Sequence, residues 1–313
     1  MVVYLKRENG KLKKLTAPEP GCWIHVYGPF GNEATQKLSE QLSIDIDFIT
    51  DSLDIDERSR YETEEGKDLI VLRTPVENEG ISDLEALYLT IPIGIIRTPD
   101  YVVTISAYNN PVVEYFMQTP PKTFDPANQE KFILSLFEKN VLKYSEFLRQ
   151  INNKRYAFEK ALYHSSRNED LFKLLNIQKS LVYFVTSLRS NDLLLLKIQR
   201  SNFLRLQEDD LDMLRDLVVD NQQALEMSEM YSNILNGTMD AFASIISNNL
   251  NEVMKRLTSV TIILTVPMLI ASLYGMNVQL PVQDNPYAFI IVFSICILCS
   301  VLISIYFIRR RWF

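Results

Sequence analysis

Two long stretches near the C-terminus contain no charged side chain, and they constrain the fold more than any other feature of the sequence. Residues 257–273 contain no Asp, Glu, Lys or Arg, and neither do residues 287–308. A helix that crosses about 30 Å of hydrocarbon needs roughly 20 apolar residues, because each residue adds 1.5 Å. The sequence therefore predicts two transmembrane helices, 257–274 and 287–308, joined by a loop over 275–286.

The charges beside these two stretches predict how the hairpin is oriented. Lys255 and Arg256 precede the first stretch and residues 309–311 are all Arg, whereas the loop between the stretches carries Asp284 and no basic residue. By the positive-inside rule, the loop faces outward. Residues 1–256 and a basic tail over 309–313 are then cytoplasmic, in a protein of the cell (inner or plasma) membrane. The start of the chain lacks the apolar core of a secretory signal.

Residues 1–126 are predicted to form a cytoplasmic α/β domain. Four runs rich in Val, Ile, Leu and Tyr are typical of strands, and they lie at 22–27, 69–76, 86–96 and 101–105. Residues 32–42 have helical spacing, with Asn32 as the expected N-cap. The acidic segment 51–58 lacks the glycine and the final acid of an EF-hand loop, so we expect a solvated helix and turn there.

A charge reversal divides the helical part of the chain. Prolines 120, 121 and 126 mark a boundary, after which residues 127–206 are predicted to form a basic pair of long helices, 128–163 and 168–206. Residues 207–256 form an acidic stalk, with ten carboxylates and one basic side chain between 208 and 252. No proline occurs from 207 to 266, which predicts one helix of about 65 residues, roughly 100 Å long, that enters the first span. A helix of this length needs neighbours, which the basic pair and other copies of the chain could supply.

Most polar residues of the first span fall on one face of the helix. At 100° per residue, seven side chains lie within an arc of about 100°: Asn251, Met254, Thr258, Thr261, Thr265, Met268 and Ser272. One explanation is that Thr and Ser hydrogen-bond to their own helix or to a neighbouring span. The continuity of the stripe as far as Asn277 favours a pore lining instead. Since one helix cannot enclose a pore, several copies around an axis are predicted.

The end of the first span carries the residues Tyr274-Gly275-Met276-Asn277. With the run 251–255 and the basic-aromatic end 309–313, this segment resembles the CorA family of magnesium transport proteins. The close match covers roughly residues 210–313, and the N-terminal part resembles the family in layout. The resemblance implies a homopentameric funnel that conducts Mg²⁺ and is gated by cytosolic Mg²⁺. Co²⁺ and Ni²⁺ are further candidate ions.

The resemblance also implies roles for individual residues. Asn277 is the expected selectivity residue within the motif 274–277, and Asn251, Met254 and Leu257 match the cytosolic pore constriction. Pore-facing positions are matched by Thr261, Thr265 and Met268. The regulatory metal residues are expected to be Asp216, Asp240 and Glu77. Pro267 stands one place from its position in the family pattern.

The chemistry of Mg²⁺ fits this lining. Mg²⁺ demands octahedral oxygen coordination and gives up water reluctantly, so a conduit holds it best through its hydration shell. Neutral hydroxyl and amide oxygens can hydrogen-bond to ion-bound water without trapping the ion. Apolar side chains at Met254, Leu257 and Met268 suit a gate that closes by dewetting. Gly275 is expected to let the backbone turn and approach closely at the mouth.

Other classes of function are less consistent with the sequence. No Walker-type motif occurs, and the membrane potential alone is a sufficient drive for a divalent cation. His25 and His164 have no partners at catalytic or metal-ligand spacing, so no enzyme is expected, and a net charge of −7 argues against a nucleic-acid partner. A Zn²⁺, Co²⁺ or Ni²⁺ transporter or effluxer of the same family, and a membrane-anchored coiled-coil scaffold, remain alternatives. A scaffold gives no reason for the polar stripe or for Asn277.

Overall fold

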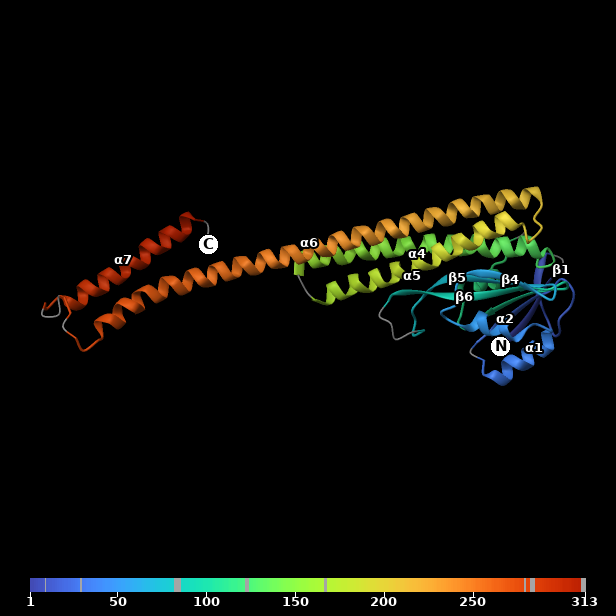
Figure 1. Ribbon diagram of the computed structural model, residues 1–313, viewed down its shortest axis with the longest axis horizontal. Helices are drawn as coiled ribbons and strands as arrows, with labels where there is room; N and C mark the ends of the chain where they lie inside the picture. The colour runs from blue at the N-terminus through green and yellow to red at the C-terminus, as the bar shows by residue number, and fades with distance from the viewer. Residues whose placement is uncertain are drawn as a thin grey trace. The chain divides into compact units, whose positions relative to one another are not determined.

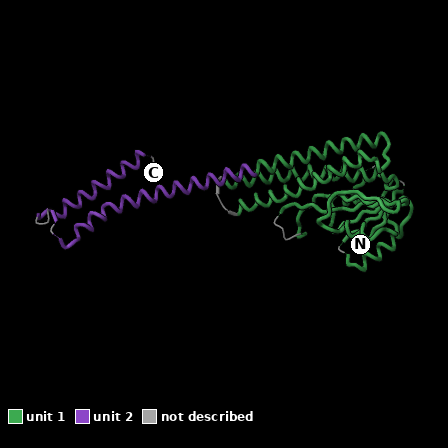
Figure 2. Tube along the Cα trace, viewed as in Figure 1, with its two compact units in different colours: residues 1–235 green, residues 236–313 purple. Residues whose placement is uncertain are grey.

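The computed structural model describes most of the chain, which divides into two compact units, residues 1–235 and 236–313 (Figure 2). Described are residues 1–8, 10–28, 30–81, 86–121, 124–165, 168–278, 280–281 and 285–310. Asp284 and Arg311 lie outside the described residues, as does the side chain of His164.

A seven-stranded sheet forms the centre of unit 1–235 (Figure 1). Its strand order is β2-β1-β3-β7-β6-β5-β4, and β3 pairs with β7 in parallel while the other neighbours are antiparallel. The bounds are β1 Val2–Glu8, β2 Lys11–Leu15, β3 Trp23–Tyr27, β4 Arg60–Glu64, β5 Lys67–Glu77, β6 Tyr88–Arg97 and β7 Val102–Ser106. The four strands expected from the sequence are confirmed as β3, β5, β6 and β7.

Helices cover both faces of this sheet, as Figure 1 shows. One face carries α1 (Asn32–Leu42) and α2 (Ile46–Leu53), and the other carries α3 (Pro111–Gln118), α4 (Gln129–Ser165) and α5 (Asn168–Ser201). The helix-and-turn expectation for residues 51–58 is confirmed, because α2 ends within that segment. The N-cap expectation for Asn32 was wrong. Gly31 occupies the cap position, and no side chain completes the cap.

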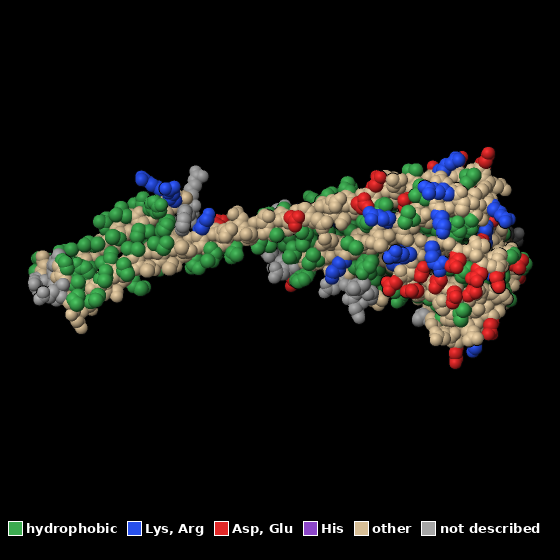
Figure 3. Space-filling model, in the orientation of Figure 1, with side chains coloured by type: hydrophobic (Ala, Val, Ile, Leu, Met, Phe, Trp, Pro, Cys, Tyr) green, Lys and Arg blue, Asp and Glu red, His purple; other side chains and the backbone are tan. Residues whose placement is uncertain are grey.

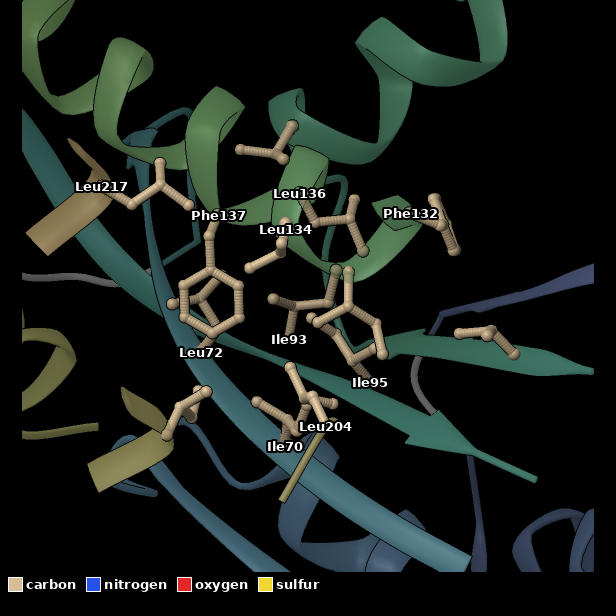
Figure 4. Packing of buried hydrophobic residues seen from close by; sticks show 14 of the residues in the cluster. Ile70, Leu72, Ile93, Ile95, Phe132, Leu134, Leu136, Phe137, Leu204 and Leu217 are labelled. Atoms are coloured by element: carbon tan, nitrogen blue, oxygen red, sulfur yellow. The ribbon is translucent and has the colours of Figure 1, made fainter. Parts of the chain in front are cut away.

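Alternating residues of the central strands feed two separate cores. Ile70 and Leu72 of β5 and Ile93 and Ile95 of β6 point toward α4, where they meet Phe137 and its neighbours (Figure 4). The intervening residues, such as Leu69 and Val71, pack on the other face with α1 and α2. Because both faces are covered, β5 and β6 are buried along almost their whole length.

The contact between α2 and β6 requires a glycine. A Cβ added to Gly94 would lie 1.7 Å from Ser52 Oγ and 2.4 Å from Ser52 Cβ. Ser52 is fully buried, and its hydroxyl donates to the carbonyl of Phe48 on its own helix at 2.6 Å. With its polar group satisfied in this way, α2 can lie directly on the backbone of β6.

The long helix α6 runs without interruption from Glu208 to Tyr274, which confirms the expectation of one helix entering the first apolar stretch. Within unit 1–235, α6 buries Leu214, Leu217 and Ala224. It also meets α5 through polar contacts, with Asn221 Nδ2 donating to Leu188 O at 3.1 Å and Arg189 pairing with Glu229 at 2.6 Å. The helix α5 ends at residue 201, five residues before the expected end, because Asn202 adopts a left-handed conformation (φ 43°).

Candidate functional site

Unit 236–313 contains the hairpin formed by the C-terminal part of α6 and by α7 (Ala288–Arg309). Both helices are long and apolar enough to cross a membrane. The bounds of α7 agree with the second apolar stretch of the sequence within one residue at each end.

One face of each helix makes the contact within the hairpin. On α6 the covered residues recur at helical spacing, and they are Ser259, Ile263, Val266, Pro267 and Ile270. On α7 the covered face is rich in small side chains, namely Cys296, Cys299, Ser300 and Ser304, beside Val292, Ile303 and Phe307. Small residues at such a seam let two helix backbones approach closely. The remaining serine of the second stretch, Ser294, is exposed.

The predicted lining residues lie on the opposite side of α6. We call them the lining stripe, and all eight are exposed in the single chain: Asn251, Met254, Leu257, Thr258, Thr261, Thr265, Met268 and Ser272. At 100° per residue, the centre of this stripe lies about 160° from the centre of the face that contacts α7. The neighbouring span of the same chain therefore does not account for these polar groups.

Two hydroxyls of the lining stripe are bonded to their own helix. Thr261 Oγ1 donates to Leu257 O at 2.8 Å, and Thr265 Oγ1 donates to Thr261 O at 2.7 Å. The self-bonded arrangement weighed in the sequence analysis thus occurs at these positions. A hydroxyl that gives its proton to the helix keeps lone pairs for an outside donor. Such an oxygen can accept a hydrogen bond from water bound to a cation.

The motif 274–277 lies at the C-terminal end of α6. Gly275 N donates to Ala271 O at 3.0 Å and to Ser272 O at 3.2 Å, and Tyr274 Oη donates to Pro281 O at 3.3 Å. Tyr274, Met276 and Asn277 are exposed.

Gly275 does not have the conformational role expected for it. Its backbone is not left-handed, and an added Cβ would meet the nearest carbonyl oxygens at 3.5 Å, an ordinary contact. Within a single chain, this turn does not require glycine.

The acidic residues expected at a regulatory site are not brought together in the single chain. Asp216 and Asp240 are exposed on α6, and their separation of 24 residues corresponds to about 36 Å along a helix. Glu77 instead lines a cavity of about 400 Å³. Among the described residues, no three His, Cys, Asp or Glu side chains are grouped to hold a metal ion.

Some residues of interest were missed by the sequence analysis. Glu79, Glu114 and Glu146 line the same cavity as Glu77, together with Lys143. They come from different parts of the chain, so no local sequence pattern identifies them as neighbours. Cys296 and Ser300 carry a detectable signal, because small residues recur every four positions at 296, 300 and 304.

Comparisons with known proteins identify the family. The profile described as "CorA-like Mg2+ transporter protein" matches residues 19–310. The chain is 28% identical over 293 residues to the "Cobalt/magnesium transport protein CorA" of Methanocaldococcus jannaschii, which covers 92% of this chain and 90% of that protein. It is 21% identical over 305 residues to the protein of the same description from Thermotoga maritima. That match covers 93% of this chain and 83% of the other protein.

Solved structures show the same architecture. The complete structure of the CorA magnesium transporter from Methanocaldococcus jannaschii has a TM-score of 0.85 and 26% identity, and covers 100% of this chain and 99% of that one. The full-length CmaX protein shares the fold, with a TM-score of 0.71, 17% identity and coverage of 100% and 97%. The expected fold, an α/β domain followed by long helices and two apolar C-terminal helices, is confirmed. The chain belongs to the family of CorA-like Mg²⁺ transporter proteins.

Proposed function

We propose that this protein is a homopentameric channel that conducts hydrated Mg²⁺ across the cell membrane and is closed by cytosolic Mg²⁺. The observation that carries the proposal is the exposed lining stripe on the face of α6 opposite α7. The names of the first two relatives, which mention cobalt and magnesium, support Mg²⁺ as the main ion and Co²⁺ as a second one. No catalytic activity is part of the proposal.

The lining stripe requires other copies of the chain. Polar side chains that face lipid are costly, because hydrocarbon offers no hydrogen-bond partner. Turning the stripe of each copy toward a common axis gives these groups water and ions, and leaves α7 on the outer side of α6. The number five comes from the family resemblance.

Ion selection would take place at the outer mouth. A ring of Asn277 amide oxygens and backbone carbonyls near Gly275 would accept hydrogen bonds from the water shell of Mg²⁺. The hydroxyls of Thr261 and Thr265 would continue the same interaction, since their protons are committed to the helix. Below them, Met254 and Leu257 would narrow the bore with apolar surface.

Closure by cytosolic Mg²⁺ would depend on acidic residues that only an assembly completes. Asp216 and Asp240 are exposed in the single chain, and Glu77 belongs to an acidic cavity. Carboxylates gathered at subunit interfaces repel one another until a divalent cation neutralises them, so ion occupancy would stabilise the closed assembly.

The proposed orientation places residues 1–256 and the basic tail 309–313 in the cytoplasm, by the positive-inside rule. A membrane potential contributes about 2.3 kcal/mol per charge per 100 mV, and this contribution doubles for a divalent cation. Inward movement of Mg²⁺ therefore needs no nucleotide.

The test is Mg²⁺ uptake into liposomes that contain the pure full-length protein, with an inside-negative potential. Thr265→Cys places a thiol on the lining stripe, and Val260→Cys places one about 120° away from its centre, at a residue that is also exposed. A positively charged thiol reagent should block uptake through the first variant only. Wild-type protein treated with the reagent controls for the native cysteines, and native mass spectrometry should give five subunits.

The outcomes separate the alternatives. Block through both cysteines or through neither would contradict the lining assignment. Uptake of Zn²⁺, Co²⁺ or Ni²⁺ without Mg²⁺ would favour the other transporters of the family. Wild-type liposomes that take up no divalent cation would favour a scaffold.

A further inference from the structure

Pro267 leaves one carbonyl of α6 without its helical partner. In a regular helix the N–H of residue 267 would donate to the carbonyl of Ile263, but proline has no N–H. The unpaired carbonyl lies on the face of α6 that contacts α7, because Ile263 and Pro267 both belong to that face. Within a membrane, such a group must find a partner in the protein.

The partner comes from α7. Ser300 Oγ donates to Ile263 O at 3.5 Å, across the seam of the hairpin. One turn further along, Cys296 Sγ is directed at Pro267 O at 3.8 Å. The two carbonyls are four residues apart on α6, and the two donors are four residues apart on α7. The contacts therefore form a short ladder between antiparallel helices.

Ser304, one turn away from Ser300 on the same face, behaves differently. Its hydroxyl donates to Ser300 O on its own helix at 2.8 Å, which is the usual arrangement for a serine inside a helix. Ser300 donates instead to the one carbonyl that a proline has left unpaired. The difference between these two serines indicates a specific function for Ser300.

We propose that Ser300 is a positioning residue that supplies the hydrogen bond lost at Pro267 and thereby fixes how α6 bends at that point. Helices kink at proline because the ring removes a bond and crowds the preceding turn. Thr265 and Met268 lie within two residues of Pro267 in sequence and belong to the lining stripe, on the side of α6 that faces away from α7. Their distance from the proposed pore axis therefore depends on this bend. Only this last step rests on the proposed function.

The experiment is a double-mutant cycle on the full-length protein in detergent. The four proteins are wild type, Ser300→Ala, Pro267→Ala and the double variant. Opening of the hairpin is measured as the labelling rate of Cys299, a half-buried thiol beside the seam, by mass spectrometry after treatment with a maleimide. Ser300→Ala should raise this rate about threefold, the size of an average interhelical hydrogen bond in a membrane.

The decisive comparison is the effect of Ser300→Ala when residue 267 is Ala. Alanine restores the N–H, so the carbonyl of Ile263 has a donor of its own and loss of Ser300 should no longer raise the labelling rate. An equal threefold rise in both backgrounds would overturn the proposal. Ser300→Thr keeps the hydroxyl and should label like wild type, and Ser304→Ala, the matched control, should not depend on residue 267.

The same four proteins, reconstituted in liposomes, test the consequence for the lining. Mg²⁺ uptake should be lower in Ser300→Ala than in wild type. Uptake by the double variant should equal uptake by Pro267→Ala. If wild-type protein shows no uptake, the proposed function fails while the labelling cycle still decides the role of Ser300. If uptake is normal but the labelling effects are additive, the role of Ser300 fails alone.

Discussion

The two compact units distribute their side chains in opposite ways. In unit 1–235, large residues such as Trp23 and Tyr88 are fully buried, and Figure 3 shows acidic and basic side chains over its surface. In unit 236–313, Leu264 is 63% exposed and Phe289 is 78% exposed, while the polar lining stripe is exposed as well. The first unit has a core of its own. The second unit exposes the apolar surface of two helices that are long enough to cross a membrane, and in the proposed function lipid and other copies of the chain would cover it.

This difference predicts that substitutions act differently in the two units. A change among the buried residues of unit 1–235 should alter the stability of a single chain, because their partners are already present, whereas the exposed Asp216 is expected to act on flux through other copies of the chain. A change in the lining stripe or at Asn277 should alter ion flux, because these side chains are exposed in the single chain and face the proposed conduit. The predictions below test that division, beginning with the largest effect.

Replacing Asn277 by Ala should abolish Mg²⁺ uptake while leaving the assembly intact. The residue is exposed just beyond the C-terminal end of α6, which the proposed orientation makes the outer mouth, where a hydrated ion would first meet amide oxygens. The measurement is uptake into liposomes, with native mass spectrometry to check assembly. Asn285→Ala is the control, since Asn285 Oδ1 accepts from Tyr287 N at 2.9 Å at the start of α7 and has no part in the motif. If Asn277→Ala takes up Mg²⁺ at the wild-type rate, the assignment of Asn277 as the selectivity residue is wrong.

Replacing Met254 or Leu257 by Gly should raise leak conductance severalfold when cytosolic Mg²⁺ is high. Both substitutions remove apolar bulk from the lining stripe, where dewetting would close the bore. Glycine also weakens a helix by about 1 kcal/mol, so the control is Val253→Gly, which is similarly exposed but about 100° from the centre of the stripe. Recordings with millimolar cytosolic Mg²⁺ provide the test. A closed state unchanged by all three variants would place the gate elsewhere.

Replacing Asp216 by Ala or Lys should weaken inhibition of flux by cytosolic Mg²⁺ and weaken the protection that Mg²⁺ gives α6 against protease. Asp216 is exposed in the single chain, so its carboxylate is accessible to a cation or to a neighbouring subunit. Glu229→Ala is a matched control, because Arg189 already neutralises that carboxylate at 2.6 Å. Full inhibition in both Asp216 variants would mean that the sensor lies in the α/β domain.

The smallest effect should be a pH dependence of stability confined to unit 1–235. Burial lowers the pKa of His25 to about 4, beside Thr104 Oγ1 at 3.0 Å. The unfolded chain therefore binds this proton first, and stability is lost as pH falls from about 6.5 toward 4. The loss at pH 5.5 should be about 1 kcal/mol. Thermal unfolding between pH 7.5 and 5 should depend less on pH in His25→Gln than in wild type, because the variant lacks this titrating group.

Local patterns were sufficient to predict much of the fold. Uninterrupted helical composition gave the single helix α6, and long uncharged runs gave its apolar end and α7. The strands β1, β2 and β4 were missed, because their many charged residues conceal the period of two; β2, for example, is Lys-Leu-Lys-Lys-Leu. The start of α1 was misjudged because Gly31 can occupy a cap position without any side-chain bond.

The position of the lining stripe could be predicted because it depends on one helix, whereas the acidic cavity depends on several elements. The stripe follows from 100° per residue along α6; its residues are exposed in the single chain, and their role in a pore stays a prediction. The acidic cavity beside Glu77 combines β5, α3 and α4, so its other carboxylates could not be found from spacing. The role of Gly275 was misjudged because a glycine at a helix end can adopt an ordinary backbone conformation.

The fit of Gly94 against Ser52 has a consequence for how the sequence can diverge. Only 1.7 Å separates a Cβ at residue 94 from the hydroxyl of residue 52, so neither position can accept a larger side chain unless α2 moves. Residues 52 and 94, which are 42 positions apart in sequence, thus compete for the same space between α2 and β6. In a lineage of such chains, they should vary as a correlated pair, with glycine retained at 94 wherever residue 52 bears more than a hydrogen.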